Sequence, residues 1–151
     1  MIAEGEKLAL KVWGGRHLTP EEIDSFLSET KIARFCCLND DGTIHATPVW
    51  FLFTNRQFII LTPDESRKAR NIKQNNSVTI LVDIEEPPRG VMIYGTAQPE
   101  TDFVLEPMVI SLCEKYMSKD KAREQWRSVC PPNTKWLRIT VTPTNIVSFT
   151  Y

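Results

Sequence analysis

The residues best suited to chemistry lie where an apolar, strand-like run gives way to a basic helical segment. The run at residues 58–61 ends in Thr62, and after a short break a helical pattern opens with Ser66, Arg67 and Lys68. The macrodipole of a helix favours anions near its N-terminus, so cations in the first turn are at the unfavourable end. Free backbone N–H groups, hydroxyls and cations together are typical of a phosphate site. We therefore predict that these residues bind a phosphorylated ligand.

The same basic cluster has a second interpretation. Asp64 and Glu65 directly precede the helix and could neutralise its cations, which would leave a solvated basic helix face that binds nothing. Arg70, which follows in the same helix, would strengthen an anion site. Both interpretations stay open on these residues alone.

A second motif, with the sequence HATPVW, occupies residues 45–50. Proline cannot donate to a sheet ladder, so Pro48 indicates a strand edge, a bulge, or a place where something else lies beside the strand. A flat polar ring lying along this strand could take hydrogen bonds from the freed backbone groups. The alternative is an ordinary edge strand whose proline discourages aggregation.

The chain offers no recognisable catalytic side-chain motif. His45 could act as an acid or a base, as histidine side chains often do, but no acid in its motif is spaced to orient it, so a half-buried structural histidine is the simpler interpretation. A Ser/His/Asp arrangement, a nucleophile elbow, a Walker loop and a dinucleotide fingerprint are all missing from the sequence. We assign no catalytic residue, and this pattern fits a protein whose cofactor carries the chemistry.

The composition is that of a single domain covering residues 1–151, with an arm at residues 1–17. Lys and Arg total 18 and Asp and Glu total 19, so the net charge of −1 argues against nucleic-acid or membrane-surface binding. No apolar segment approaches the roughly 20 residues that span a bilayer, and the N-terminus lacks a signal-peptide core. We expect a cytoplasmic protein with reduced, structural cysteines. The cysteine and histidine spacing predicts no metal site.

Strand patterns dominate the middle of the chain. The expected strands cover residues 32–38, 43–53, 57–62, 78–84, 91–97 and 136–141, the last extended by residues 146–151. The expected helices begin at Pro20, at Ser66, at Thr101 or Asp102, and near Lys119. The first three strands are predicted to form a meander, and Asn75 with Asn76 can close the second helix in the left-handed conformation. Six strands with intervening helices predict an antiparallel, barrel-like α+β domain.

The order of these motifs resembles the FMN-binding split-barrel superfamily, the pyridoxine 5′-phosphate oxidase-like proteins. The resemblance covers roughly residues 18–97, and residues 136–151 match more loosely. It implies a six-stranded antiparallel split β-barrel with flanking helices, a homodimer, and FMN sites at the subunit interface. Four residues are then expected at the cofactor phosphate: Thr62, Ser66, Arg67 and Lys68. Four are expected along the isoalloxazine ring: Thr47, Pro48, Val49 and Trp50. The partner chain would supply the remaining wall.

Two departures bear on the activity that the resemblance implies. The region that carries a basic Arg-x-x-x-Arg-Leu motif in the B6-oxidising enzymes reads WLRIT at residues 136–140, which argues against vitamin B6 oxidation. The sequence SRKARN at residues 66–71 also resembles the branch that binds the deazaflavin coenzyme F-420. That cofactor has a long acidic tail and needs an extended basic groove, which Arg67, Lys68, Arg70 and Lys73 could begin. The net charge of −1 favours FMN.

The resemblance implies an FMN-dependent oxidoreductase that acts on a small molecule. A flavin-binding or carrier protein without turnover is an alternative, because the substrate motif is missing. A haem-utilisation relative on the same fold is another; it would need an axial histidine, and the sequence holds only His17 and His45.

Overall fold

The computed structural model describes residues 14–29, 31–129 and 133–151. Most of the expected N-terminal arm, including Trp13, and the isolated Cys130 lie outside these ranges. The four helices of the described chain are α2 (Pro20–Ser28), α3 (Arg67–Gln74), α4 (Leu105–Glu114) and α5 (Lys119–Val129). Its seven strands are β1 (Ala33–Leu38), β2 (Ile44–Val49), β3 (Leu52–Thr54), β4 (Gln57–Pro63), β5 (Ser77–Ile84), β6 (Arg89–Glu100) and β7 (Trp136–Thr150).

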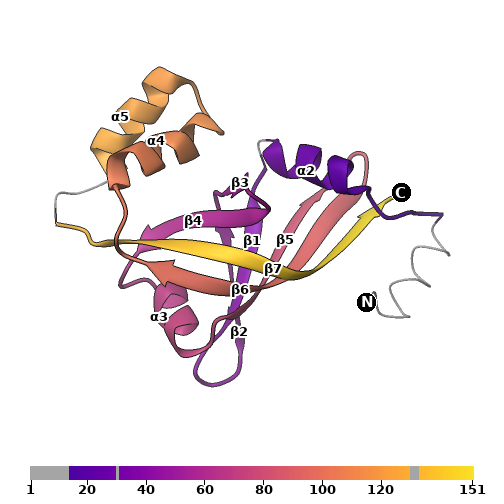
Figure 1. The fold of residues 1–151 in the computed structure, drawn as a ribbon, viewed down its shortest axis with the longest axis horizontal. Helices are drawn as coiled ribbons and strands as arrows, with labels where there is room; N and C mark the ends of the chain where they lie inside the picture. Colours follow the sequence, from indigo (N-terminus) through magenta and orange to yellow (C-terminus); the bar gives the residue numbers. More distant parts are fainter. Residues whose placement is uncertain (1–13, 30, 130–132) are drawn as a thin grey trace.

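The strands form one curled antiparallel sheet in the order β2-β1-β5-β6-β7-β4-β3. The long strands β6 and β7 lie at its centre, and helices α2 and α3 lie on opposite sides of it in Figure 1. The α4–α5 pair is inserted between β6 and β7 and projects beyond the strands. The predicted α+β class is confirmed, and the curled sheet is consistent with a split barrel.

The prediction of six strands is wrong, because the segment at residues 43–53 is divided. Residues 50 and 51 leave the ladder, so β2 ends at one edge of the sheet and β3 begins at the other. Both pairings of the predicted meander occur, β1 with β2 and β3 with β4, but the two pairs lie at opposite ends of the sheet order and do not form one continuous meander. The break is possible because groups from another element replace the lost ladder bonds. The Phe51 N–H donates to Tyr116 Oη at 3.0 Å, and Lys115 Nζ donates to the Phe51 carbonyl at 3.1 Å.

Three predicted element boundaries also differ from the structure. Asn75 has an extended backbone rather than a left-handed one, so α3 continues directly into β5. Helix α4 begins later than Thr101 or Asp102, and its N-cap residue Val104 makes no side-chain capping bond. Pro143 does not interrupt β7, because it lies opposite Gly95 where a bulge shifts the register of the ladder. Bulges are places where a sheet tolerates proline.

The inner face of the sheet and one side of α2 enclose the main core. Its largest buried side chains include Phe26 of α2, Phe35 of β1 and Phe58 of β4, each at most 1% exposed. A second, smaller cluster joins α4 and α5 to the sheet through Trp50 and Leu61. The α4–α5 hairpin therefore has its own apolar contacts and lies beside the main core, not within it.

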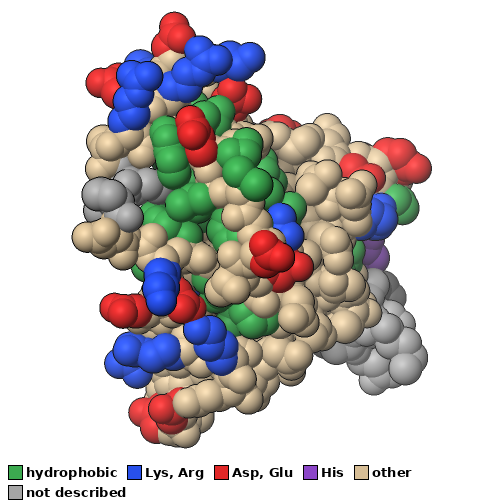
Figure 2. Space-filling view, turned by 60° about the vertical axis from the view of Figure 1, so that its left-hand side comes forward, with side chains coloured by type: hydrophobic (Ala, Val, Ile, Leu, Met, Phe, Trp, Pro, Cys, Tyr) green, Lys and Arg blue, Asp and Glu red, His purple; other side chains and the backbone are tan. Residues whose placement is uncertain are grey.

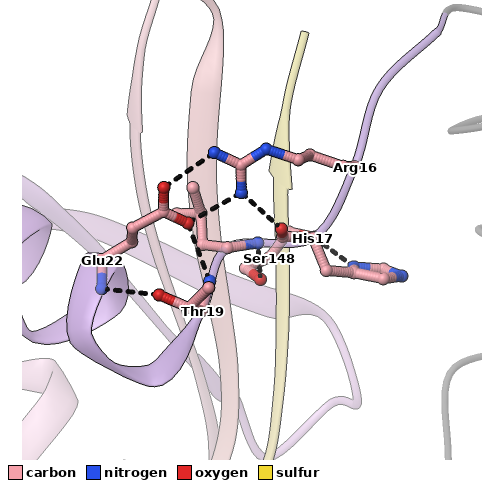
Figure 3. Close-up of polar contacts among 6 residues, drawn as sticks. Arg16, His17, Thr19, Glu22 and Ser148 are labelled. Carbon is pink, nitrogen blue, oxygen red and sulfur yellow. Dashed lines mark hydrogen bonds and ion pairs between the residues drawn. The ribbon is translucent and has the colours of Figure 1, made fainter.

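The start of α2 is fastened to the end of β7 by polar contacts, which Figure 3 shows. Thr19 and Glu22 form a capping box at the helix start predicted at Pro20. Arg16 makes two bonds of 2.7 Å to the Glu22 carboxylate, and these lower the pKa of Glu22 to about 2. His17 Nδ1 lies 2.6 Å from the Ser148 carbonyl oxygen of β7. These contacts hold residues 16–19, which include few apolar side chains, in a fixed position between β7 and the start of α2.

Candidate functional site

The end of β4 and the start of α3 bring three of the predicted phosphate residues together. Thr62 is on the inner face of β4 and only 2% exposed, because the strand alternates up to its end. Ser66 caps α3 and accepts from the Ala69 N–H at 3.2 Å. Thr62 Oγ1 donates to Ser66 Oγ at 2.9 Å, and Lys68 Nζ lies 3.5 Å from Thr62 Oγ1. Two hydroxyls, one ammonium and the start of a helix therefore meet at one place.

The charge state of this cluster suits an anion. Burial is the main cause that lowers the pKa of Lys68. Among the residues that the structure describes, no carboxylate forms an ion pair with Lys68. Asp64 forms its ion pair with Lys73, on the outer side of α3. A partly desolvated cation without a counter-ion favours binding of an anion. The neutralisation by Asp64 that the sequence left open therefore does not reach Lys68.

Arg67 does not join this cluster. Its side chain is exposed and lines a separate, open recess beside the β1–β2 turn, together with Asp41 and His45. Arg67 is also a minor cause of the lowered pKa of Asp41, after the bonds that Asp41 makes with Thr43. Arg70 is likewise exposed. The four cations of the basic run therefore point in different directions, and only Lys68 faces the hydroxyls of Thr62 and Ser66.

The second predicted motif lies on β2, which is the outer edge of the sheet. Pro48 is opposite Arg34 of β1, and its other side has no neighbouring strand within the described chain. This is the edge position that the proline predicted. Thr47 points to the inner side of the strand, and its Oγ1 is buried without a hydrogen-bond partner among the described residues. An unpaired buried hydroxyl is costly, so this atom is a candidate ligand contact.

The two motifs meet at one cavity of about 300 Å³. Five of the eight predicted residues line it: Pro48, Val49, Trp50, Thr62 and Lys68. Five lining residues from α4, α5 and β7 were not predicted: Val109, Leu112, Cys113, Gln125 and Trp136. Figure 2 shows a broad apolar area between charged side chains at the top of the molecule and a group of basic and acidic side chains lower down. The cavity is thus apolar over most of its wall and basic at one end.

Sequence reasoning missed the residues that hold α4 against the site. The Tyr116 ring stacks on Trp50 with centroids 4.6 Å apart and planes 9° from parallel. Tyr116 Oη donates to the Lys31 carbonyl at 2.8 Å. Lys115 Nζ donates to the Leu27 carbonyl at 2.9 Å and lies 3.4 Å from the centroid of the Phe51 ring. These residues carry no local sequence signal, because their partners are 64 to 88 positions away.

The environment changes the acidity of both anchoring groups. Burial raises the pKa of the Tyr116 phenol. Burial, with Lys31 as a nearby like charge, lowers the pKa of Lys115 to about 8. Tyr116 therefore remains a protonated phenol and Lys115 becomes a titratable amine, and both lie next to the ring-lining segment.

The two histidines considered for haem are not brought together. His17 contacts the β7 backbone near the C-terminus, whereas His45 is opposite Cys37 near the β1–β2 turn. Neither lines the cavity between the two motifs. No cluster of metal-ligating side chains occurs within residues 14–29, 31–129 and 133–151. In the same ranges, no helix is both long and apolar enough to cross a bilayer.

Comparison with known proteins agrees with this geometry. A family model described as pyridoxamine 5′-phosphate oxidase matches residues 19–147. A search of curated proteins found no match. A conserved hypothetical protein from Mycobacterium tuberculosis is 21% identical with a TM-score of 0.73, and the likeness covers 88% of this chain and 85% of that one.

Two further solved structures share the fold. An F420 reductase is 22% identical with a TM-score of 0.63, over 85% of this chain and 98% of that one. An FAD-binding protein from Mesorhizobium loti is 12% identical with a TM-score of 0.65, over 90% and 96% of the two chains. At these identities the structures show the fold alone, whereas the family model covers most of the sequence. The chain therefore belongs to the pyridoxamine 5′-phosphate oxidase family, within the split-barrel flavin-binding superfamily.

Proposed function

We propose that this protein is an FMN-binding oxidoreductase that acts on a small molecule at the interface of a homodimer. One observation carries the proposal. Lys68, a half-buried cation without a carboxylate partner in the described chain, lies with the hydroxyls of Thr62 and Ser66 at the polar end of the apolar cavity. That arrangement separates a phosphate position from a ring position, as a flavin mononucleotide requires.

The residues present fit such a cofactor. Lys68 and the hydroxyl of Ser66 would hold the phosphate, with Thr62 orienting both through its bonds. Thr47, which directly precedes the cavity-lining Pro48, has an unpaired buried hydroxyl, and the backbone of Pro48 lies on a strand edge. When bound, FMN supplies hydride and electron transfer, which the side chains alone do not. The chain would hold the ring, keep water from it and present the substrate.

The cation positions favour FMN over a deazaflavin with an acidic tail. Such a tail would need several cations along one groove, but Arg67 faces the recess beside Asp41 and Lys73 pairs with Asp64. Of the cations in the described ranges, only Lys68 lines the cavity. The F420 reductase among the similar structures makes a deazaflavin the second candidate.

Exposed apolar residues on the outer side of the β1–β2 edge support the homodimer. Ile44 is 72% exposed and Leu38 is 38% exposed, and the two lie opposite each other across β1 and β2. Paired exposed aliphatic side chains at a sheet edge are a liability for a monomer. A second copy covering this edge would bury them close to the strand that carries Thr47 and Pro48.

The experiment that tests the proposal compares two lysines on the same helix. Lys68→Ala should weaken FMN binding by about tenfold or more, because a charge-assisted hydrogen bond contributes roughly 1.5–3 kcal/mol. Lys73→Ala removes the same charge from the exposed side of α3 and should leave the affinity within about twofold. Fluorescence titration of the apoprotein with FMN gives both values.

Equal FMN affinity in Lys68→Ala and in the unsubstituted protein would refute the phosphate assignment. The absorption spectrum of the purified protein separates the cofactors, since a deazaflavin absorbs in one band to the blue of the flavin bands. Sedimentation that gives a 17.3 kDa monomer with tightly bound FMN would refute the interface site.

A further inference from the structure

We propose that the α4–α5 hairpin is the substrate-selecting wall of this cavity, and that it admits a small, flat, uncharged molecule and rejects anions. Within this wall we assign Gln125 as the hydrogen-bonding residue for that molecule. The inference rests on the proposed function, since the cofactor phosphate must occupy Lys68.

The hairpin is held at a defined distance from the ring-lining strand. Tyr116 stacks on Trp50, and its hydroxyl bonds the backbone of Phe51 and of Lys31. Lys115 bonds the carbonyls at the ends of α2 and of the β2–β3 break. The residues that follow α4 therefore supply the hydrogen-bonding partners of Phe51 and the stacking partner of Trp50. Because the same residues continue into Pro48 and Val49, the hairpin and the proposed ring site form one unit.

The wall that the hairpin presents carries no charge. Val109, Leu112 and Cys113 face the cavity from α4, and all three are at most 8% exposed. Gln125 is the only lining residue from α5. The lysines, arginines and acids within α5 are exposed, and Figure 2 shows charged side chains gathered at that end of the molecule. The helices therefore turn their charges to solvent and their apolar side chains to the cavity.

This distribution determines the class of molecule that can bind. Among the lining residues that the structure describes, Lys68 is the only charged one, and it lies at the end assigned to the phosphate. An anionic substrate would lose its hydration against Val109, Leu112 and Cys113 with no cation to replace it. A neutral flat molecule meets mostly apolar surface, the Gln125 amide, and the indole N–H of Trp136, which is buried without a partner among the described residues. The volume of about 300 Å³ lies at the lower end of small-molecule sites and must also hold the cofactor ring, so the substrate must be small.

The test measures binding of two matched probes to the FMN-loaded protein by equilibrium dialysis at pH 7. Naphthalene-2-carboxamide is neutral, and naphthalene-2-carboxylate has the same shape with a negative charge. The carboxamide should bind about tenfold or more tightly than the carboxylate. Equal affinities, tighter binding of the carboxylate, or no binding of either probe would overturn the inference.

Two charge variants locate the selectivity. Gln125→Lys places a cation in the wall and should remove or reverse the preference. Val104→Lys makes the same charge change at a residue that precedes α4 and is 74% exposed, and it should keep the preference. If both variants change the ratio equally, the wall does not select, and the inference fails. Gln125→Leu should weaken carboxamide binding without strengthening carboxylate binding.

The outcome for the cofactor is scored separately. FMN loading is read from the flavin absorption before any probe is added, so loaded protein without probe selectivity overturns only this inference. If the protein does not load FMN, the proposed function fails. The probes are then dialysed with inorganic phosphate present to neutralise Lys68, and the same ratio still decides whether the wall selects.

Discussion

Removing one hydroxyl from Tyr116 should release the α4–α5 hairpin from the sheet. Tyr116→Phe keeps the ring that stacks on Trp50, so the packing change is small. It deletes the oxygen that accepts from the Phe51 N–H at 3.0 Å and donates to the Lys31 carbonyl at 2.8 Å. Phe51 has a fully buried side chain and no ladder partner for this N–H, because the sheet is interrupted there.

The magnitude follows from these two bonds. A buried donor left without a partner costs about 1–3 kcal/mol, and a lost ordinary bond about 0.5–1.5 kcal/mol. The Lys31 carbonyl is nearer the surface and can bond water, so we expect a total loss of about 2–3 kcal/mol. For a chain of this size that corresponds to a fall in Tm of about 4–12 °C.

Urea unfolding followed by tryptophan fluorescence measures this loss, since Trp50 reports directly on the stacking contact. Tyr94→Phe is the matched control, because Tyr94 is 39% exposed and its change should stay within about 0.5 kcal/mol. If Tyr116→Phe is no less stable than Tyr94→Phe, the hydroxyl does not support the strand break, and the argument for a fixed hairpin is refuted.

Two further predictions concern the same scaffold. Burial and the nearby Lys31 lower the pKa of Lys115 to about 8, so between pH 8 and the ordinary value of 10.5 the unfolded chain retains a proton that the folded protein has released. The free energy of unfolding should therefore rise with pH over this range, relative to that of Lys115→Met. A difference between the two proteins that stays constant with pH in thermal unfolding would contradict this. Gly95→Ala should destabilise the protein by about 1–3 kcal/mol in urea unfolding, because the added Cβ would lie 2.7 Å from the Thr142 carbonyl oxygen and 2.9 Å from Val141 Cγ1. The control is Thr96→Ala at the neighbouring exposed residue. If the two variants are equally stable, the bulge relaxes and the predicted clash does not occur.

Local signals predicted most of the individual elements. The capping box at Thr19 and the cap at Ser66 depend on neighbours three residues away, so they are visible in sequence. The edge position of Pro48 was visible as well, because proline lacks the donor that a central strand needs. The division of residues 43–53 was not visible. Its apolar run suits a strand throughout, and only contacts from residues more than 60 positions away interrupt it.

The candidate site shows the same division between local and tertiary information. The sequence by itself determined that a threonine, a capping serine and several cations lie at one strand-to-helix junction. Only the tertiary structure decided that Lys68 faces Thr62 while Arg67 faces the β1–β2 turn, because consecutive helical residues point about 100° apart and the sheet lies on one side of the helix. The α4–α5 wall was likewise decided by tertiary structure. Its helices are separated from the ring-lining strand by four strands and a helix in sequence, and the Trp50–Tyr116 stack brings them to it in space.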